Sequence, residues 1–254
     1  MEESPLGLDI WFTAMWLLAN AKNGISSYEL HRALGITQKS AWFVLHRVRL
    51  ALNAGSFEKK LTGIVESDES YIGGRISNMH KDKKEKMPKG RGTVGKAIVM
   101  GVLERGDAGK LSSVRAKVIQ DIRRETLHGE IRSNVEEGSS IFTDSLASYQ
   151  GLEADYVHKF VDHAVQYVDG VVHTNGLENF WSLLKRTVRG TYTHIDADHL
   201  FRYLDEQAYR FNNRKDDDQG RFVKALGSVT GKRLTYKELI GKDSKKPEQK
   251  QKKE

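Results

Sequence analysis

The chain has 254 residues, with 41 Lys and Arg against 34 Asp and Glu and a formal net charge of +7. This length suits one sizeable domain with a small accessory region. The sequence contains no cysteine, which excludes disulfides and thiolate zinc sites. No segment approaches the ~20 consecutive apolar residues that a membrane-spanning helix needs, so we expect a cytoplasmic protein.

Residues 8–54 are expected to be helical throughout. Ser26 and Glu29 have the spacing of a capping box for a helix that Gly35 ends, and Thr37 can cap the next helix. Two helices joined by a glycine-containing turn form the outline of a helix-turn-helix, although such pairs also occur in modules that bind proteins. In a DNA-binding unit, the first residues of the second helix face the bases, and basic residues further along face phosphates. The predicted base-reading residues are Gln38, Lys39 and Ser40, and the predicted phosphate contacts are Arg47 and Arg49.

A mixture of strands and helices follows. The predicted strands are 62–72, 97–103, 111–119 and 139–143, and the predicted helices are 121–135, 175–189 and 197–213. The second strand is a nearly continuous apolar run, which is typical of a central strand covered on both faces. This order predicts an α/β fold in which an RNase H-like mixed sheet with flanking helices follows the small all-helical region.

Two segments are rich in basic residues. Arg75–Lys96 holds eight Lys or Arg against two acids, and Lys242–Glu254 holds six Lys against three acids. Such segments favour a polyanion, most often nucleic acid, but they are equally typical of solvated, disordered chain. The first segment joins two predicted strands, and a polar connection of that length tends to be functional or disordered.

Three acidic residues occur in the order strand Asp, strand Asp, helix Glu: Asp68, Asp144 and Glu178. An RNase H-like sheet gathers carboxylates of this order at one point, where they can hold two divalent cations about 4 Å apart. Each acid also has an ordinary structural interpretation, as a turn acid, a helix cap or a charge on an outer helix face. By strand alternation, Glu66 shares the face of Asp68 and Glu69 points the other way.

The helix from Asn175 carries Glu178 and Lys185 two turns apart on one polar flank, beside an apolar stripe. Lys185 can therefore grip a phosphate of a substrate strand near the acids. The alternative is an amphipathic helix with an ordinary charged outer face. On the last long helix, Glu206 and Arg210 have the spacing of a buried salt-bridge network, although its polar residues could also contact DNA.

Four sequence blocks together resemble one known family. SDESYIGG, IFTDSLASY, HTNGLENFWSLLKRTVRGTY and HLFRYLDEQAYRFNNRK are similar to the signature blocks of bacterial insertion-sequence DDE transposases of the ISXO-type group, which is related to eukaryotic Merlin elements. The resemblance extends from about Leu6 to Arg214. It implies that Asp68, Asp144 and Glu178 are the catalytic, metal-binding acids and that Lys185 is the accompanying catalytic lysine. Some members have Asn in place of the third acid, so Glu178 and Asn175 are alternatives for completing the metal site.

The resemblance implies an enzyme that cuts element ends and joins 3′-hydroxyls to target DNA by phosphoryl transfer with two Mg²⁺ or Mn²⁺ ions. The expected partner is double-stranded DNA at the element ends and the target, and we expect a homo-oligomer on DNA, near the nucleoid and away from membranes. Further predicted DNA contacts are Lys83, Lys84, Lys89, Arg91 and Asn175. The alternatives are a structure-specific RNase H-like nuclease and a catalytically idle DNA-binding remnant.

Members of the group typically begin with a cysteine-based zinc ribbon, and this sequence starts near where such a ribbon would end. We therefore expect a copy that lacks that module. The expected domains are a helix-turn-helix DNA-binding region at 1–56, an RNase H-like DDE catalytic domain at 57–215, and a basic, flexible C-terminal tail at 216–254.

Overall fold

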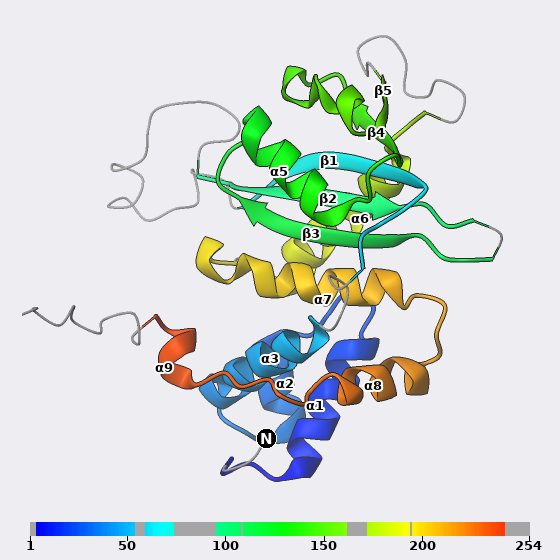
Figure 1. Cartoon of the computed structure of the whole chain (residues 1–254). Helices are drawn as coiled ribbons and strands as arrows, with labels where there is room; N and C mark the ends of the chain where they lie inside the picture. The colour runs from blue at the N-terminus through cyan, green and yellow to red at the C-terminus, as the bar shows by residue number, and fades with distance from the viewer. Residues whose placement is uncertain are drawn as a thin grey trace, which may run out of the picture.

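The computed structural model describes residues 4–53, 59–73, 95–107, 109–161, 172–193 and 195–241. Figure 1 shows two lobes: a sheet lobe, and a helical lobe in which the N-terminal helices lie beside helices from the C-terminal part of the chain. Among the described residues, no helix is long and apolar enough to cross a membrane.

The helical lobe begins with α1 (Leu8–Asn20), α2 (Ser27–Leu34) and α3 (Gln38–Leu52). The predicted capping box is present, because Ser26 accepts from the Glu29 backbone and Glu29 accepts from the Ser26 backbone. Gly35 ends α2 with φ of 66°, a left-handed conformation that glycine adopts without steric cost. Thr37 caps α3 through the Ser40 backbone N–H. These local signals explain why the sequence patterns located α2 and α3.

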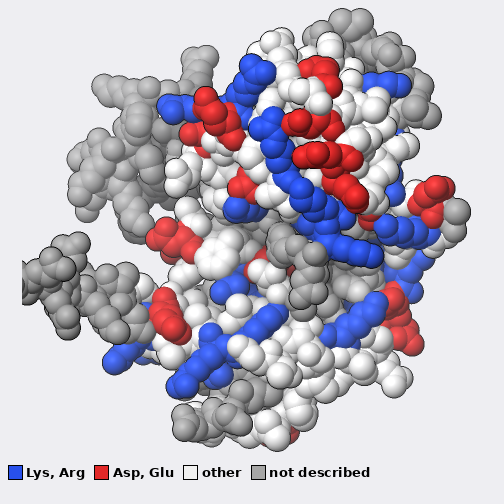
Figure 2. Space-filling model, viewed as in Figure 1, with Lys and Arg blue, Asp and Glu red and all other residues white. Residues whose placement is uncertain are grey.

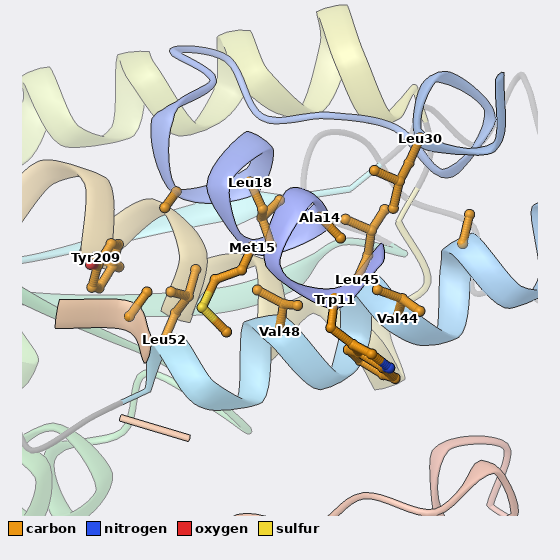
Figure 3. Close-up of a cluster of buried hydrophobic side chains, with 13 residues drawn as sticks. Trp11, Ala14, Met15, Leu18, Leu30, Val44, Leu45, Val48, Leu52 and Tyr209 are labelled. Atoms are coloured by element: carbon orange, nitrogen blue, oxygen red, sulfur yellow. The ribbon is translucent and has the colours of Figure 1, made fainter. Parts of the chain in front are cut away.

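One apolar core packs the helices of the helical lobe together, as Figure 3 shows. Its buried side chains come from α1, α2, α3 and the later helices, and they include Trp11, Met15, Leu18, Leu30, Leu45, Val48, Tyr209 and Ala225. Ala225 lies in α8 (Asp218–Gly227), which is followed by the short α9 (Tyr236–Leu239). The structure therefore differs from the expected flexible tail: the described part after residue 216 is folded, because α8 buries Ala225 against α1 and Asp217 caps it.

The sheet contains β1 (Ile64–Ile72), β2 (Ala97–Glu104), β3 (Ser113–Ile119), β4 (Ser140–Asp144) and β5 (Val157–Val161). Their order is β3-β2-β1-β4-β5, with the first three strands antiparallel and with β4 parallel to both β1 and β5. This mixed sheet with flanking helices is the RNase H-like arrangement that the sequence predicted. The sequence patterns did not indicate β5, a five-residue strand in which Phe160 is 60% exposed.

Helices cover both faces of the sheet (Figure 1). On β2, Met100 and Val102 pack into the cluster that contains α5 (Arg124–Asn134), whereas Val99 and Leu103 pack with α6 (Asn175–Thr187) and α7 (Leu200–Asn212). This division follows from strand alternation. A π-helical turn (Val188–Tyr192) continues α6, and short 3₁₀ turns span Ala147–Tyr149, Leu152–Ala154 and Ala197–His199.

Candidate functional site

Two of the predicted acids lie at the same level of neighbouring strands. The last paired residues of the parallel strands β1 and β4 are Glu66 and Phe142. Two residues beyond that pair, β1 reaches Asp68 and β4 ends at Asp144. The sheet order therefore brings together two aspartates that are 76 positions apart in the sequence.

The carboxyl group of Asp68 is held from above the sheet by α6. The Trp181 indole N–H donates a hydrogen bond of 2.9 Å to Asp68 Oδ2. Burial raises the pKa of Asp68 to about 6; the Trp181 hydrogen bond opposes this shift, and the charges of Asp144 and Glu178 add to it. Asp144 and Glu178 are thus both close enough to Asp68 to act on it electrostatically. The sequence placed Trp181 only in an apolar stripe, although a buried indole N–H usually needs a partner.

Two glycines let α6 approach the sheet. A Cβ atom at Gly101 of β2 would lie 2.7 Å from the Trp181 ring, and one at Gly176 would lie 2.8 Å from Glu66 Oε2. Glu66 is buried and accepts hydrogen bonds from the Leu177 backbone N–H at 2.9 Å and from Arg105 Nε at 2.7 Å. Glu66 shares the face of Asp68, as strand alternation predicted, and there it anchors the first turn of α6.

An open cleft of about 820 Å³ lies between β1 and α6. The lining residues with ionisable side chains are Asp68, Glu69, Glu178, Lys185, Arg186 and Arg189. Glu178 is exposed and Lys185 is half-buried, so the structure brings this predicted pair to the same cleft as Asp68. Asn175 is exposed at the start of α6, one turn before Glu178.

The acids suit a hard divalent cation by their chemistry. Carboxylate oxygens are preferred ligands of Mg²⁺, and mutual repulsion among three carboxylates is what a cation relieves. Within the described part of the chain, no three His, Cys, Asp or Glu side chains are close enough to hold one ion. The acids therefore suit a metal ion by chemical type and charge. In the described residues they lie too far apart for three of them to bind the same ion.

Sequence reasoning missed a contact on the other face of β1. Tyr149, in the 3₁₀ turn after β4, is buried and donates its hydroxyl hydrogen to the Glu69 carboxylate. Burial raises the pKa of Glu69 to about 8; the Tyr149 hydrogen bond opposes this shift, and the charges of Asp68 and Asp144 add to it. A buried tyrosine hydroxyl usually has a partner, but nothing in the sequence indicates which one.

The predicted base-reading residues make contacts within the protein. Gln38 donates to Ser27 Oγ at 2.9 Å, and the Ser40 hydroxyl lies 2.9 Å from that of Thr37. The exposed Lys39 places its ammonium 4.8 Å from the ring centre of Tyr236 in α9. Base reading by these residues stays a prediction. On the face in Figure 2, Lys and Arg are interspersed with Asp and Glu over the sheet lobe, so charge alone does not mark a DNA path there.

The structure gives Arg49 a different place from the predicted one. Arg49 is 1% exposed, and its Nε lies 2.6 Å from Oε2 of the fully buried Glu206 in α7. Its guanidinium therefore has no surface open to a phosphate, and the expected phosphate contact is corrected to a buried ion pair between α3 and α7. Arg47 is half-buried with its guanidinium 4.9 Å from the Trp11 ring centre. Lys83, Lys84, Lys89 and Arg91 lie outside the described residues.

The five-stranded mixed sheet, with helices packed on both faces, defines an α/β protein with an RNase H-like fold. The model of the ISXO2-like transposase domain family matches residues 60–212, and the chain belongs to this family of transposases. An uncharacterized transposase-like protein of Haemophilus influenzae is 30% identical over 110 residues, which cover 43% of this chain and 89% of that protein. A chain in the crystal structure of a pre-cleavage Mos1 transpososome aligns over 88% of this chain and 80% of its own length, at 11% identity and a TM-score of 0.30.

Proposed function

We propose that this transposase cuts DNA at element ends and joins the 3′-hydroxyls to target DNA by metal-dependent phosphoryl transfer. The observation that carries the proposal is the cleft in which Asp68 of β1 faces Glu178 and Lys185 of α6, with Asp144 close enough to raise the pKa of Asp68. In a member of a transposase family, such a cleft suits a DNA phosphodiester better than an uncharged substrate.

Asp68, Asp144 and Glu178 would hold the divalent ions. When bound, Mg²⁺ or Mn²⁺ supplies polarisation of the phosphodiester and neutralises charge on the attacking and leaving oxygens. Glu178 is favoured over Asn175 as the third ligand because Glu178 lines the cleft and its charge acts on Asp68.

The remaining residues position these groups and the substrate. Trp181 orients the Asp68 carboxylate through its indole N–H, and Glu66 holds the first turn of α6 against β1. Lys185 is a compact cation on the same helix flank as Glu178 and can neutralise a phosphate of the bound strand. Positioning and charge neutralisation are the main tasks that phosphoryl transfer asks of a protein.

DNA binding is assigned to the helical lobe, in which α2, a glycine turn and α3 form a helix-turn-helix outline. We retain residues 1–56 as the DNA-binding region and 57–215 as the catalytic domain. The active species on DNA is proposed to be a homo-oligomer. Asn175, which is exposed at the start of α6, remains a proposed DNA contact.

The test is DNA cleavage and strand transfer by the full chain with duplexes carrying the element end. Asp68→Asn and Asp144→Asn are expected to abolish nicking in Mg²⁺ or Mn²⁺ while DNA binding changes little. Asp107→Asn is the matched control, because Asp107 is exposed in the loop after β2. Nicking by either active-site variant near the parent rate contradicts the assignment. Cutting without joining identifies a nuclease, and binding without metal-dependent cutting identifies an idle remnant.

A further inference from the structure

We propose that Tyr149 is a positioning residue that sets the spacing between Asp68 and Asp144; the proposal rests on the proposed metal-dependent function. Tyr149 is 1% exposed and occupies the 3₁₀ turn that follows β4. It lies on the chain segment that carries Asp144, and its hydroxyl reaches the strand that carries Asp68. Neither the sequence motifs nor the cleft between β1 and α6 assigns it this role.

The phenol of Tyr149 bridges to both neighbours of Asp68. Its hydroxyl donates to the Glu69 carboxylate and lies 3.2 Å from the Ser67 hydroxyl oxygen. By strand alternation, Ser67 and Glu69 project from the face of β1 opposite to Asp68. Trp181 holds the Asp68 carboxylate on the α6 side, so β1 is fixed from both faces at this one position.

The backbone of the turn connects Tyr149 to the other aspartate. The Leu146 N–H donates to Asp144 Oδ1 at 3.0 Å, and the Tyr149 N–H donates to the Leu146 carbonyl at 3.0 Å. A continuous series of hydrogen bonds therefore runs from the Asp144 carboxylate, through the turn and the Tyr149 ring, to the residues that flank Asp68.

The Tyr149 hydrogen bonds connect β1 to the segment after β4 at a level where the two strands no longer pair through their backbones. The backbone pairing of β1 with β4 has its last pair at Glu66 and Phe142, two residues before the aspartates. Beyond that point, the Tyr149 bridge takes over the fixing of one strand relative to the other. Because a cation held by both carboxylates needs a defined separation between them, loosening the bridge is expected to weaken metal binding before it affects DNA binding.

The experiment compares Tyr149→Phe with Tyr156→Phe in the full chain. Both tyrosines are buried in the same core cluster, but the Tyr156 hydroxyl donates to the Val135 carbonyl oxygen at 3.4 Å. Mn²⁺ and Mg²⁺ are titrated while the melting temperature and, separately, the cleavage of an element-end duplex are measured. Loss of a group that supports metal ligands costs about 10–100-fold in metal affinity. Tyr149→Phe is therefore expected to raise the half-maximal metal concentration at least tenfold in both assays.

At saturating Mn²⁺, cleavage by Tyr149→Phe is expected to recover, and Tyr156→Phe is expected to follow the parent throughout. Equal metal dependence in the two variants overturns the proposal and leaves Tyr149 as a packing residue. If Tyr149→Phe fails to fold by circular dichroism, Ser67→Ala replaces it, because it removes one arm of the bridge and leaves the ring in place. It is expected to shift the metal dependence in the same direction, and an unchanged titration overturns the proposal.

Different results contradict the proposed function and the positioning role of Tyr149. A parent protein whose stability and cleavage do not respond to Mg²⁺ or Mn²⁺ overturns the proposed function and the role of Tyr149 with it. A parent protein that responds normally, beside an unshifted Tyr149→Phe, overturns only the positioning role.

Discussion

The surroundings of Asp68 act on its pKa in opposite directions. Burial and the charges of Asp144 and Glu178 favour the neutral acid, whereas the Trp181 N–H favours the carboxylate. A group in this position is costly to ionise in the absence of a cation and becomes favourable to ionise beside one. Asp68 is therefore a residue at which pH and stability are linked, and the proposed metal binding would act on both.

The metal-free protein is expected to lose stability as pH rises through the pKa of Asp68, which is about 6 in the folded state and 3.8 for the unperturbed group. Because the folded pKa is raised, the contribution is fully present below pH ~4 and is lost as pH rises through ~6. Since the side chain is only half-buried, we expect a change of about 1–2 kcal/mol. Urea unfolding in EDTA between pH 4.5 and 7.5 measures it.

Asp68→Asn is the informative variant for this effect, because the amide oxygen can still accept from Trp181. It is expected to be more stable than the parent at pH 7.5 and equal to it near pH 4.5. Asp107→Asn, an exposed control, is expected to follow the parent at both values. Parallel pH curves for Asp68→Asn and the parent would show that Asp68 titrates normally.

At the scale of single elements, the position of α6 depends on two glycines as much as on polar contacts. Gly101 leaves room for the Trp181 ring on β2, and Gly176 leaves room for Glu66 at the first turn. The polar contacts of Glu66 and Asp68 then fix the helix along its length. The position of Glu178 over the sheet follows from these contacts.

Gly101→Ala is expected to displace α6, because the new methyl group would lie 2.7 Å from the Trp181 ring. Overpacking of this kind costs about 1–3 kcal/mol, and cleavage should fall further than stability because the acids move apart. Gly129→Ala in α5 is the control, since nothing lies within 4 Å of its new methyl group. Thermal unfolding and cleavage rates are compared, and normal cleavage by Gly101→Ala would contradict the role of α6.

The N-terminal part of α3, which is proposed to read DNA, is contacted by α9. Tyr236 contacts the Lys39 ammonium and packs edge-on against Phe43 at 5.8 Å between ring centres. Tyr236→Ala is expected to raise DNA affinity about 2–5-fold, because an exposed cation–π contact is worth about 0.5–1 kcal/mol. Tyr236→Phe keeps the ring and should bind like the parent in fluorescence anisotropy. Weaker binding by Tyr236→Ala would instead make α9 part of the DNA-binding surface.

Across the whole molecule, a buried polar cluster joins the two lobes. Glu206 of α7 is fully buried and accepts from Arg49 of α3, from Arg210, and from the Tyr192 hydroxyl at 2.5 Å. Tyr192 ends the π-helical turn that continues α6. The helix proposed to read DNA and the helix that carries Glu178 are thus connected through one carboxylate.

Arg49→Met is expected to destabilise the protein by about 1–3 kcal/mol, because it removes one charged hydrogen bond from the buried Glu206, which keeps Arg210 and Tyr192 as partners. Differential scanning calorimetry is expected to show a lower melting temperature, with the two lobes unfolding less cooperatively than in the parent. Arg132→Met serves as the control, since Arg132 forms a partly exposed pair with Asp155 that should contribute at most about 1 kcal/mol. Equal losses of stability in the two variants would contradict a stabilising role of the Glu206 cluster between the lobes.

The sequence by itself determined the features that depend on local chemistry. Caps at Ser26 and Thr37 and a left-handed Gly35 delimit α2 and α3, and the apolar runs predicted four of the five strands. The order of Asp68, Asp144 and Glu178, together with the signature blocks, indicated the transposase family to which the chain belongs. These signals are readable because each depends on residues only a few positions apart.

Only the tertiary structure decided which groups meet across the fold. Arg49 resembles a surface arginine in sequence, but its partner Glu206 lies 157 positions away. Tyr149 reaches Glu69 across 80 positions, and Ala225 turns part of an expected tail into a packed helix. Composition and periodicity describe each segment alone, whereas burial and pairing depend on what the folded chain places opposite it. For that reason the sequence could predict that Asp68 and Glu178 share one cleft, but not the contacts that hold them there.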